Sequence, residues 1–112
     1  MKKKLTTEED YRLRVDRVCM YIREHLDKEI DMRRLAVLSA FSPFHFHRIM
    51  RAYLKEPIGA FIIRTRVETA AKLLRYTDLP VADIAYRVGY DTPSSLTKSF
   101  CKLFGISPKM YS

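Results

Sequence analysis

The chain has 112 residues, of which 47% are apolar and 30% are charged. That length suits one domain with its own core, and the composition excludes a low-complexity or wholly disordered chain. The formal net charge is +8, which favours a polyanionic partner such as nucleic acid or an acidic lipid surface. The excess lies in residues 32–112, which hold 13 basic and only 5 acidic side chains.

Neither a signal peptide nor a transmembrane helix is predicted. Residues 1–10 begin with a basic stretch but continue with polar residues, and no run approaches about 18 apolar residues. We therefore expect a cytoplasmic protein without a membrane partner that starts with a flexible basic arm over residues 1–10. Cys19 and Cys101 lie among apolar residues and are predicted to be buried thiols without a disulfide.

Apolar residues recur at steps of three and four along most of the chain, which predicts amphipathic helices. The first is expected from Tyr11 to Leu26, and a short helix follows the capping residue Asp31. Ser42-Pro43 offers a capping hydroxyl followed by a proline at the first helical position. The later helices are predicted over about 57–76, from Pro80 to Gly89, from Thr92-Pro93 through the buried residues Leu96, Phe100, Leu103 and Phe104, and in a short turn after Gly105.

The sequence contains an internal repeat. A shift of 50 residues places Ser42-Pro43 on Thr92-Pro93, and a shift of 49 places Leu35-Ala36 on Ile84-Ala85. Each copy consists of a short helix, a tight turn and a capped helix, which is the organisation of a helix-turn-helix unit. Since no strand pattern is present, the predicted fold is all-α, with seven helices arranged as two helix-turn-helix subdomains (11–56 and 77–112) and a linker helix (57–76).

The second helix of such a unit enters the major groove of DNA, and its outward face here lacks carboxylates. Arg and Lys suit guanine, Ser and Thr bind bases or phosphates, and an exposed Phe suits the thymine methyl group. The predicted base-reading residues on the two helices are Phe44, His47, Arg48 and Arg51, then Ser94, Ser95, Thr97 and Lys98. Packing at the helix start is the alternative for Phe44.

Other basic residues and the capping hydroxyls are predicted to bind phosphates. They are Arg33, Arg34, Ser42, Arg64, Arg66, Lys72, Arg87, Thr92 and Lys102; a solvated surface is the alternative for Arg33 and Arg34. A linker helix of about 20 residues is about 30 Å long, close to the 34–36 Å or so between successive major-groove faces. We expect one chain, as a monomer, to read two adjacent segments of double-stranded DNA.

No catalytic triad, paired carboxylates, phosphate loop or cysteine cluster is found, so neither an enzyme nor a cofactor is predicted. His45 and His47 are two residues apart on a helix and point to different sides, so no metal site is expected. A helical protein-interaction module without DNA binding is the alternative function, and a DNA-repair fusion is a more distant one.

The sequence resembles the DNA-binding domain of the AraC/XylS family of bacterial transcription regulators over about residues 11–111. The most specific segments are Ile84-Ala85-Tyr86-Arg87-Val88-Gly89-Tyr90, Leu96-Thr97-Lys98-Ser99-Phe100 and Gly105-Ile106-Ser107-Pro108-Lys109-Met110-Tyr111. The resemblance implies two helix-turn-helix units on adjacent segments of promoter DNA, an activator that contacts RNA polymerase, and a location on the bacterial nucleoid. It also adds Pro93 to the base-reading positions.

Three residues depart from the family pattern. Ala40 and Lys55 stand where the family often has Gly; because a left-handed Ala is strained, the first turn is expected to take a different backbone path. Pro93 lacks a backbone donor at a base-facing position. Many family members carry an effector-sensing domain, so we expect the chain to be the DNA-binding part of a longer effector-responsive regulator. A stand-alone regulator is the alternative.

Overall fold

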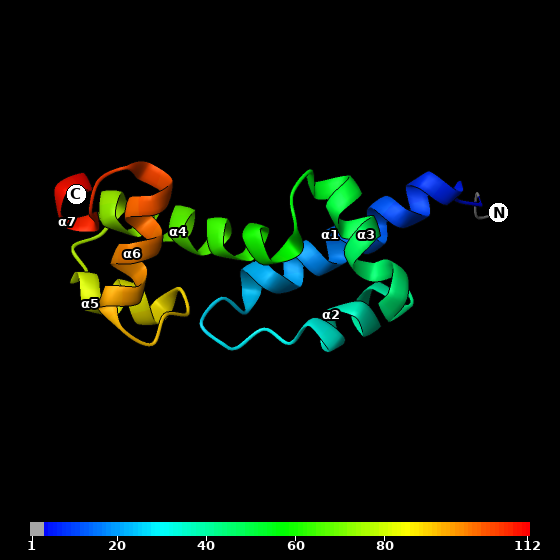
Figure 1. Ribbon diagram of the computed structural model, residues 1–112, viewed down its shortest axis with the longest axis horizontal. Coiled ribbons are helices and arrows are strands. Elements are labelled where there is room, and N and C mark those ends of the chain that lie inside the picture. Colours follow the sequence, from blue (N-terminus) through cyan, green and yellow to red (C-terminus); the bar gives the residue numbers. More distant parts are fainter. Residues whose placement is uncertain (1–3) are drawn as a thin grey trace. The chain divides into compact units, whose positions relative to one another are not determined.

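The computed structural model describes residues 4–112 (Figure 1). Over this range the chain forms seven helices and no strand, which confirms the predicted all-α fold. The helices are α1 (Thr7–Glu24), α2 (Met32–Ser39), α3 (Pro43–Leu54), α4 (Ile58–Tyr76), α5 (Val81–Arg87), α6 (Pro93–Phe104) and α7 (Pro108–Tyr111). The chain divides into two compact units: unit 1 holds the described residues up to His25 with Ile30–Ile58, and unit 2 holds Leu26–Glu29 with Gly59–Ser112.

Helix α1 begins at Thr7, four residues before the predicted start at Tyr11. The Thr6 hydroxyl accepts a hydrogen bond from the Glu9 amide at 3.1 Å, and the Glu9 carboxylate accepts one from the Thr6 amide at 3.3 Å. This capping box satisfies two amides at the helix end, so the helix extends into the segment predicted as a flexible arm. Residues 1–3 of that arm lie outside the described residues.

Unit 1 is built on α1, which packs against both α2 and α3, while α2 and α3 pack against each other. Within α1 the predicted apolar stripe is buried. On α2 and α3 part of the predicted inward set is buried, whereas Met32, Ile49, Tyr53 and Leu54 are half-buried. The buried side chains from these helices are Val15, Val18, Cys19, Ile22, Leu35, Ala36, Phe46 and Met50. Burial raises the pKa of the Cys19 thiol above its ordinary value, because the thiolate is poorly solvated there.

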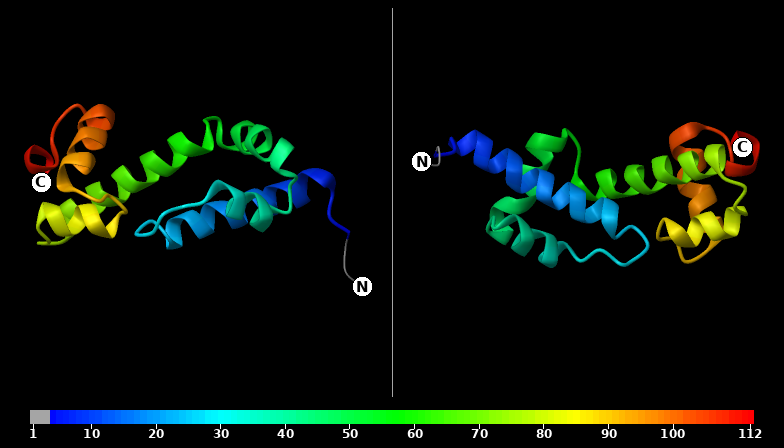
Figure 2. Two further views of the ribbon diagram at one scale, coloured as in Figure 1. Left: turned by 60° about the horizontal axis from the view of Figure 1, so that its bottom comes forward. Right: turned by 180° about the vertical axis from the view of Figure 1, so that it is seen from behind.

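Unit 2 has its own core, to which α4, α5 and α6 all contribute. These helices lie beside one another in Figures 1 and 2, and their inward residues form one buried cluster. Its members are Val67, Ala70, Ala71, Leu74, Ile84, Ala85, Val88, Leu96 and Phe100. The second half of α4, the predicted linker helix, is therefore part of the core of the second helix-turn-helix unit.

The last turn of α6 differs from the prediction. Leu103 is 45% exposed and Phe104 is 39% exposed, so placing them in the core was wrong. The Phe104 ring contacts Tyr111 of α7 with ring centroids 5.5 Å apart, but this four-residue helix leaves Leu103 open. Cys101 is half-buried instead of buried; both cysteines are free thiols.

Candidate nucleic-acid interface

Helices α3 and α6 begin in the same way. The Ser42 hydroxyl accepts a hydrogen bond from the amide three residues later at 3.3 Å, and the Thr92 hydroxyl does so at 3.1 Å. A proline occupies the first helical position of both helices, where no backbone hydrogen bond is lost. The repeat predicted from the sequence is thus also a repeat of local structure.

The outer surface of α3 carries all four side chains predicted to read bases in unit 1. Phe44 is 83% exposed, so it does not pack into the core at the helix start; its ring meets the His45 ring edge-on, with centroids 5.1 Å apart. His47, Arg48 and Arg51 are exposed on the same helix. Neither Arg48 nor Arg51 has an ion-pair partner within residues 4–112.

The outer surface of α6 carries shorter and more polar side chains than that of α3. Ser94, Ser95 and Lys98 are exposed, whereas Pro93 and Thr97 are half-buried. The Thr92 hydroxyl donates to Ser95 Oγ at 3.0 Å, so the Ser95 hydroxyl keeps its own proton to donate outward. Pro93 has no backbone amide to donate at the start of the helix, so the side-chain donors on this surface are the hydroxyls and the Lys98 ammonium group.

The residues predicted to bind phosphates fall into two groups. Exposed members without an ion-pair partner in the described part of the chain are Arg33, Arg34, Lys72, Arg87 and Lys102. Arg33 and Arg34 line a shallow hollow on α2 together with Tyr21, Asp31, Val37 and Leu38. The other members already have intramolecular partners: Ser42 and Thr92 cap helices, and Arg64 and Arg66 are bound as follows.

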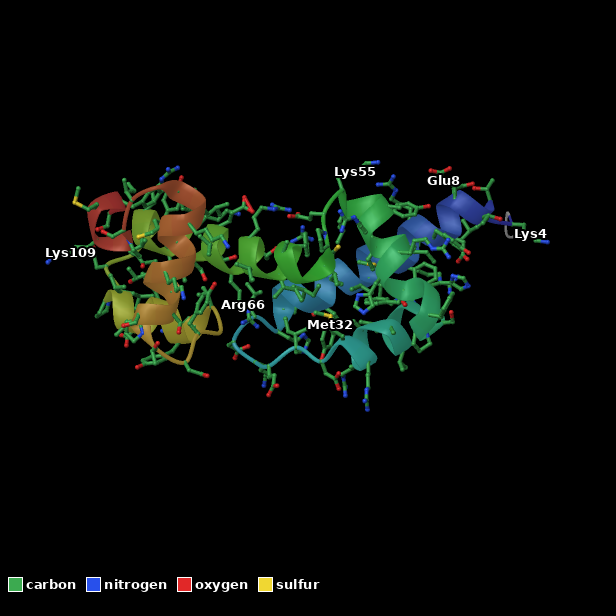
Figure 3. The ribbon with its side chains drawn as sticks, in the orientation of Figure 1. Lys4, Glu8, Met32, Lys55, Arg66 and Lys109 are labelled. Atoms are coloured by element: carbon green, nitrogen blue, oxygen red, sulfur yellow. The ribbon has the colours of Figure 1, made fainter. Side chains whose placement is uncertain are left out.

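Arg64 and Arg66 both point from α4 but meet different groups. Arg64 Nη1 lies 2.7 Å from a carboxylate oxygen of Glu68, one turn along the helix. Arg66 donates from Nη1 to the Gly89 carbonyl and from Nη2 to the Lys28 carbonyl, each at 3.2 Å (Figure 3). Both Nη groups of Arg66 therefore donate to backbone carbonyls, whereas the exposed cations of the first group have no such partner within residues 4–112.

The turn between α2 and α3 does not adopt the different backbone conformation that was predicted from the presence of alanine at position 40. Ala40 adopts the left-handed conformation, with φ 59° and ψ 18°. Arg14 of α1 donates to the Ser39 carbonyl at 2.6 Å and also to the Ala40 carbonyl. These charge-assisted bonds at the carboxyl end of α2 offset the strain, so the usual turn is kept without glycine.

Arg14 is a residue that the sequence analysis missed. It also pairs with Asp10 at 3.1 Å and lies over the Phe41 ring, with Cζ 4.1 Å from the ring centroid. The two carbonyls that it binds at the turn are 25 and 26 residues away along the chain, so no local periodicity signals these contacts. It positions the turn that leads into α3 and hence the reading surface of unit 1.

Two kinds of feature are absent from residues 4–112. No three His, Cys, Asp or Glu side chains lie together in a way that suits a metal ion. No helix in this range combines the length and apolarity needed to cross a membrane. Both histidines of the His45-x-His47 pattern are exposed.

Two helix-turn-helix units, each with an exposed, acid-free second helix, define a helix-turn-helix DNA-binding domain. A family model described as a helix-turn-helix domain matches residues 35–112. The chain belongs to the AraC family of transcription regulators, as a DNA-binding domain.

Similar proteins include two named regulators. The chain is 32% identical over 97 residues to the HTH-type transcriptional activator AarP of Providencia stuartii, a match that covers 87% of this chain and 72% of AarP. It is 35% identical over 98 residues to the F1 operon positive regulatory protein of Yersinia pestis, covering 87% of this chain and 33% of that protein. The chain thus spans most of one relative and about a third of the other.

Solved structures of the same fold include a DNA complex. The DNA-binding domain of AdpA, solved with a target DNA, has 30% sequence identity and a TM-score of 0.81, with 87% of both chains covered. The C-terminal domain of AraT, a response regulator from Geobacillus stearothermophilus, has 31% identity and a TM-score of 0.80, covering 97% of this chain and 86% of that one.

Proposed function

We propose that the chain reads specific double-stranded DNA sequences by placing α3 and α6 in adjacent major-groove segments. The observation that carries this proposal is the pair of equally capped helices whose exposed surfaces bear donors and cations but no carboxylate. DNA presents phosphates and base edges that accept hydrogen bonds from such groups. In functional terms residues 11–56 and 77–112 are the reading units and 57–76 the linker.

Base contacts are assigned to the outward side chains of the two helices. On α3 the cations Arg48 and Arg51 suit guanine, and the exposed Phe44 ring suits a thymine methyl group. On α6 hydroxyl donors and Lys98 take this part. The complete set is Phe44, His47, Arg48, Arg51, Pro93, Ser94, Ser95, Thr97 and Lys98.

Phosphate contacts are assigned to the exposed cations first. Arg33, Arg34, Lys72, Arg87 and Lys102 have no competing ion pair among the described residues. Arg64 must exchange its bond to Glu68 for a phosphate, and Ser42 and Thr92 must bind phosphate while capping their helices. Arg66 is withdrawn from this set because backbone carbonyls occupy its guanidinium.

The length of α4 supports readout of two segments by one chain. Its 19 residues span about 28 Å at the usual rise per residue, which compares with the 34–36 Å or so between major-groove faces one turn apart. The two reading surfaces differ in sequence, so the DNA site is asymmetric and a monomer of this domain suffices to occupy it.

The names of the relatives support a role in activating transcription. AarP is described as a transcriptional activator and the Yersinia pestis protein as a positive regulator. We therefore propose an activator that contacts RNA polymerase on promoter DNA in the bacterial cytoplasm and has no enzymatic activity of its own.

The deciding experiment is selection of bound duplexes from a random pool. We expect recovery of an asymmetric site with two sequence-specified segments whose centres lie about one helical turn apart. A symmetric site, or a single specified segment, would contradict the two-helix reading.

A salt titration with a random duplex separates this function from a protein-interaction module. Affinity should fall steeply with salt, because each phosphate contact releases counterions. Binding that is absent at low salt, or nearly independent of salt, would favour the interaction module.

A further inference from the structure

The connection between α1 and α2 contains a segment that belongs to unit 2. Leu26–Glu29 lies within unit 2, although the residues on both sides of it belong to unit 1. We call Leu26–Glu29 the strap. Leu26 is buried, and the contacts of the strap described below are made by its backbone carbonyls.

The backbone of the strap approaches Gly89 very closely. A Cβ built on Gly89 would lie 1.9 Å from the Leu26 carbonyl oxygen, a distance at which the two atoms overlap. Gly89 also has a φ of +99°, which favours glycine on its own account. Two independent requirements therefore meet at this residue, and the first of them exists only because the strap lies there.

Arg66 binds the strap and the Gly89 turn with one guanidinium. Its Nη1 donates to the Gly89 carbonyl and its Nη2 to the Lys28 carbonyl, both at 3.2 Å. Its Nε is buried and has no hydrogen-bond partner among the described residues. Figure 3 shows the labelled Arg66 side chain reaching from α4 to the loop that follows α1.

The turn held by Arg66 leads directly into the reading helix of unit 2. The Gly89 amide donates to the Tyr86 carbonyl at 3.2 Å and the Tyr90 amide to the Ala85 carbonyl at 2.9 Å. Two residues later Thr92 caps α6. Contacts that hold the backbone of Gly89 in place therefore also set the direction in which the chain enters α6.

We propose that Arg66 and Gly89 form a clasp that seats the strap against the turn before α6, and that Arg66 is a positioning residue for DNA reading by unit 2. The effect on DNA reading rests on the proposed function above. The clasp itself does not, because its contacts exist without DNA. The role of Arg66 differs from that of a phosphate ligand, since its guanidinium already donates to backbone carbonyls.

The first test replaces Arg66 by Met, which keeps an unbranched apolar stem like that of arginine but removes the guanidinium and its donors. Amide hydrogen exchange in the strap and in residues 86–92 should rise at least tenfold, with exchange in α3 unchanged. The slope of log affinity against log salt on a random duplex should stay the same, and protection of the segment read by α6 should weaken. Lys72→Met, on the exposed part of the same helix, should leave exchange unchanged and lower the slope by about one.

Arg66→Lys keeps a positive charge and a donor, so it should show an intermediate rise in exchange. Unchanged exchange in Arg66→Met would overturn the clasp. A slope lowered by about one would instead show that Arg66 binds phosphate. If the unaltered chain does not bind DNA, the proposed function is overturned. The exchange measurements would then test the clasp by themselves.

The second test uses two glycines with positive φ. Gly105 has a φ of +78° but nothing lies within 4 Å of a Cβ built on it, so Gly105→Ala introduces backbone strain without a clash. We expect Gly89→Ala to raise exchange in the strap and Gly105→Ala to leave the strap unchanged. Adding Arg66→Met to Gly89→Ala should raise strap exchange little further, because both changes open the same contact. Equal strap exchange in the two glycine variants would contradict the proposal.

Discussion

Ala40 and Lys55 show how single residues depart from local backbone preference. Both adopt left-handed conformations, with φ of 59° and 64°, which residues with a Cβ adopt at a cost. At Ala40 the Arg14 guanidinium binds the carbonyls at the end of α2. The strain of a left-handed alanine predicted a different backbone conformation at this turn. The hydrogen bond from Arg14, 26 residues away along the chain, stabilises the left-handed conformation instead.

Ala40→Gly should stabilise the domain, because glycine adopts the left-handed conformation without strain. We expect the free energy of unfolding to rise by about 0.5–1 kcal/mol, measured by urea denaturation. Ala52→Gly is the matched control: Ala52 is exposed within α3, so that change should lower stability by about 0.5–1 kcal/mol. A loss of stability in Ala40→Gly would show that the left-handed alanine carries no strain.

Tyr90→Phe tests a buried hydroxyl that lacks a partner among the described residues. Its removal should leave the free energy of unfolding unchanged or raise it by about 1 kcal/mol, because an unsatisfied buried polar group is destabilising. Tyr111→Phe is the control, since its hydroxyl accepts from Arg75 Nη2 at 2.8 Å, and it should lower stability slightly. Thermal unfolding of both variants makes the comparison; a clear drop in the Tm of Tyr90→Phe would reveal an unseen partner such as water.

At the scale of elements, the capped helices α3 and α6 were predictable because their signals are local. A hydroxyl followed by proline specifies where each helix starts, and the apolar spacing specifies which side is buried. The end of α6 was not predictable in the same way. Leu103 continues the apolar spacing yet is exposed, because burial depends on whether another element covers that turn.

Thr92→Ala should destabilise the start of α6 by removing its cap. We expect the free energy of unfolding to fall by about 1 kcal/mol and the Ser95 amide, which now donates to the Thr92 hydroxyl, to exchange faster. Ser94→Ala changes an exposed hydroxyl of the same helix and should alter neither quantity. Equal effects of the two changes would mean that the Thr92 cap adds no stability.

At the scale of the whole molecule, the two units have separate buried cores and separate reading helices. Helices α3 and α6 each pack mainly against residues of their own unit. A substitution on the outer surface of one helix should therefore leave the structure of the other unchanged. The sequence repeat predicts two helix-turn-helix units with residues 57–76 as a separate linker, whereas unit 2 takes in α4 from Gly59 onward. The assignment of the strap to unit 2 was not predicted, because Leu26–Glu29 has no counterpart signal in the sequence.

Arg48→Ala and Lys98→Ala should relax sequence preference at different segments of the DNA site. Each loss should amount to about 1–3 kcal/mol of discrimination if the side chain binds a base, measured by footprinting and by competition with mutated sites. Arg87→Ala, at an exposed cation proposed to bind phosphate, should weaken all sequences about equally. Loss of protection at the same segment in both base-reading variants would contradict the two-unit arrangement.

The sequence by itself determined the presence of the helices, the capped starts of α3 and α6, the repeat and the outward residues of these two helices, because these depend on spacing and on neighbours within a few residues. The tertiary structure alone decided which cations are available. Arg33, Arg48 and Lys98 are exposed, whereas Arg14 and Arg66 bind backbone carbonyls more than 20 residues away. All five are basic residues in a chain of net charge +8, and only the contacts made on folding distinguish a cation that faces solvent from one that holds a turn in place.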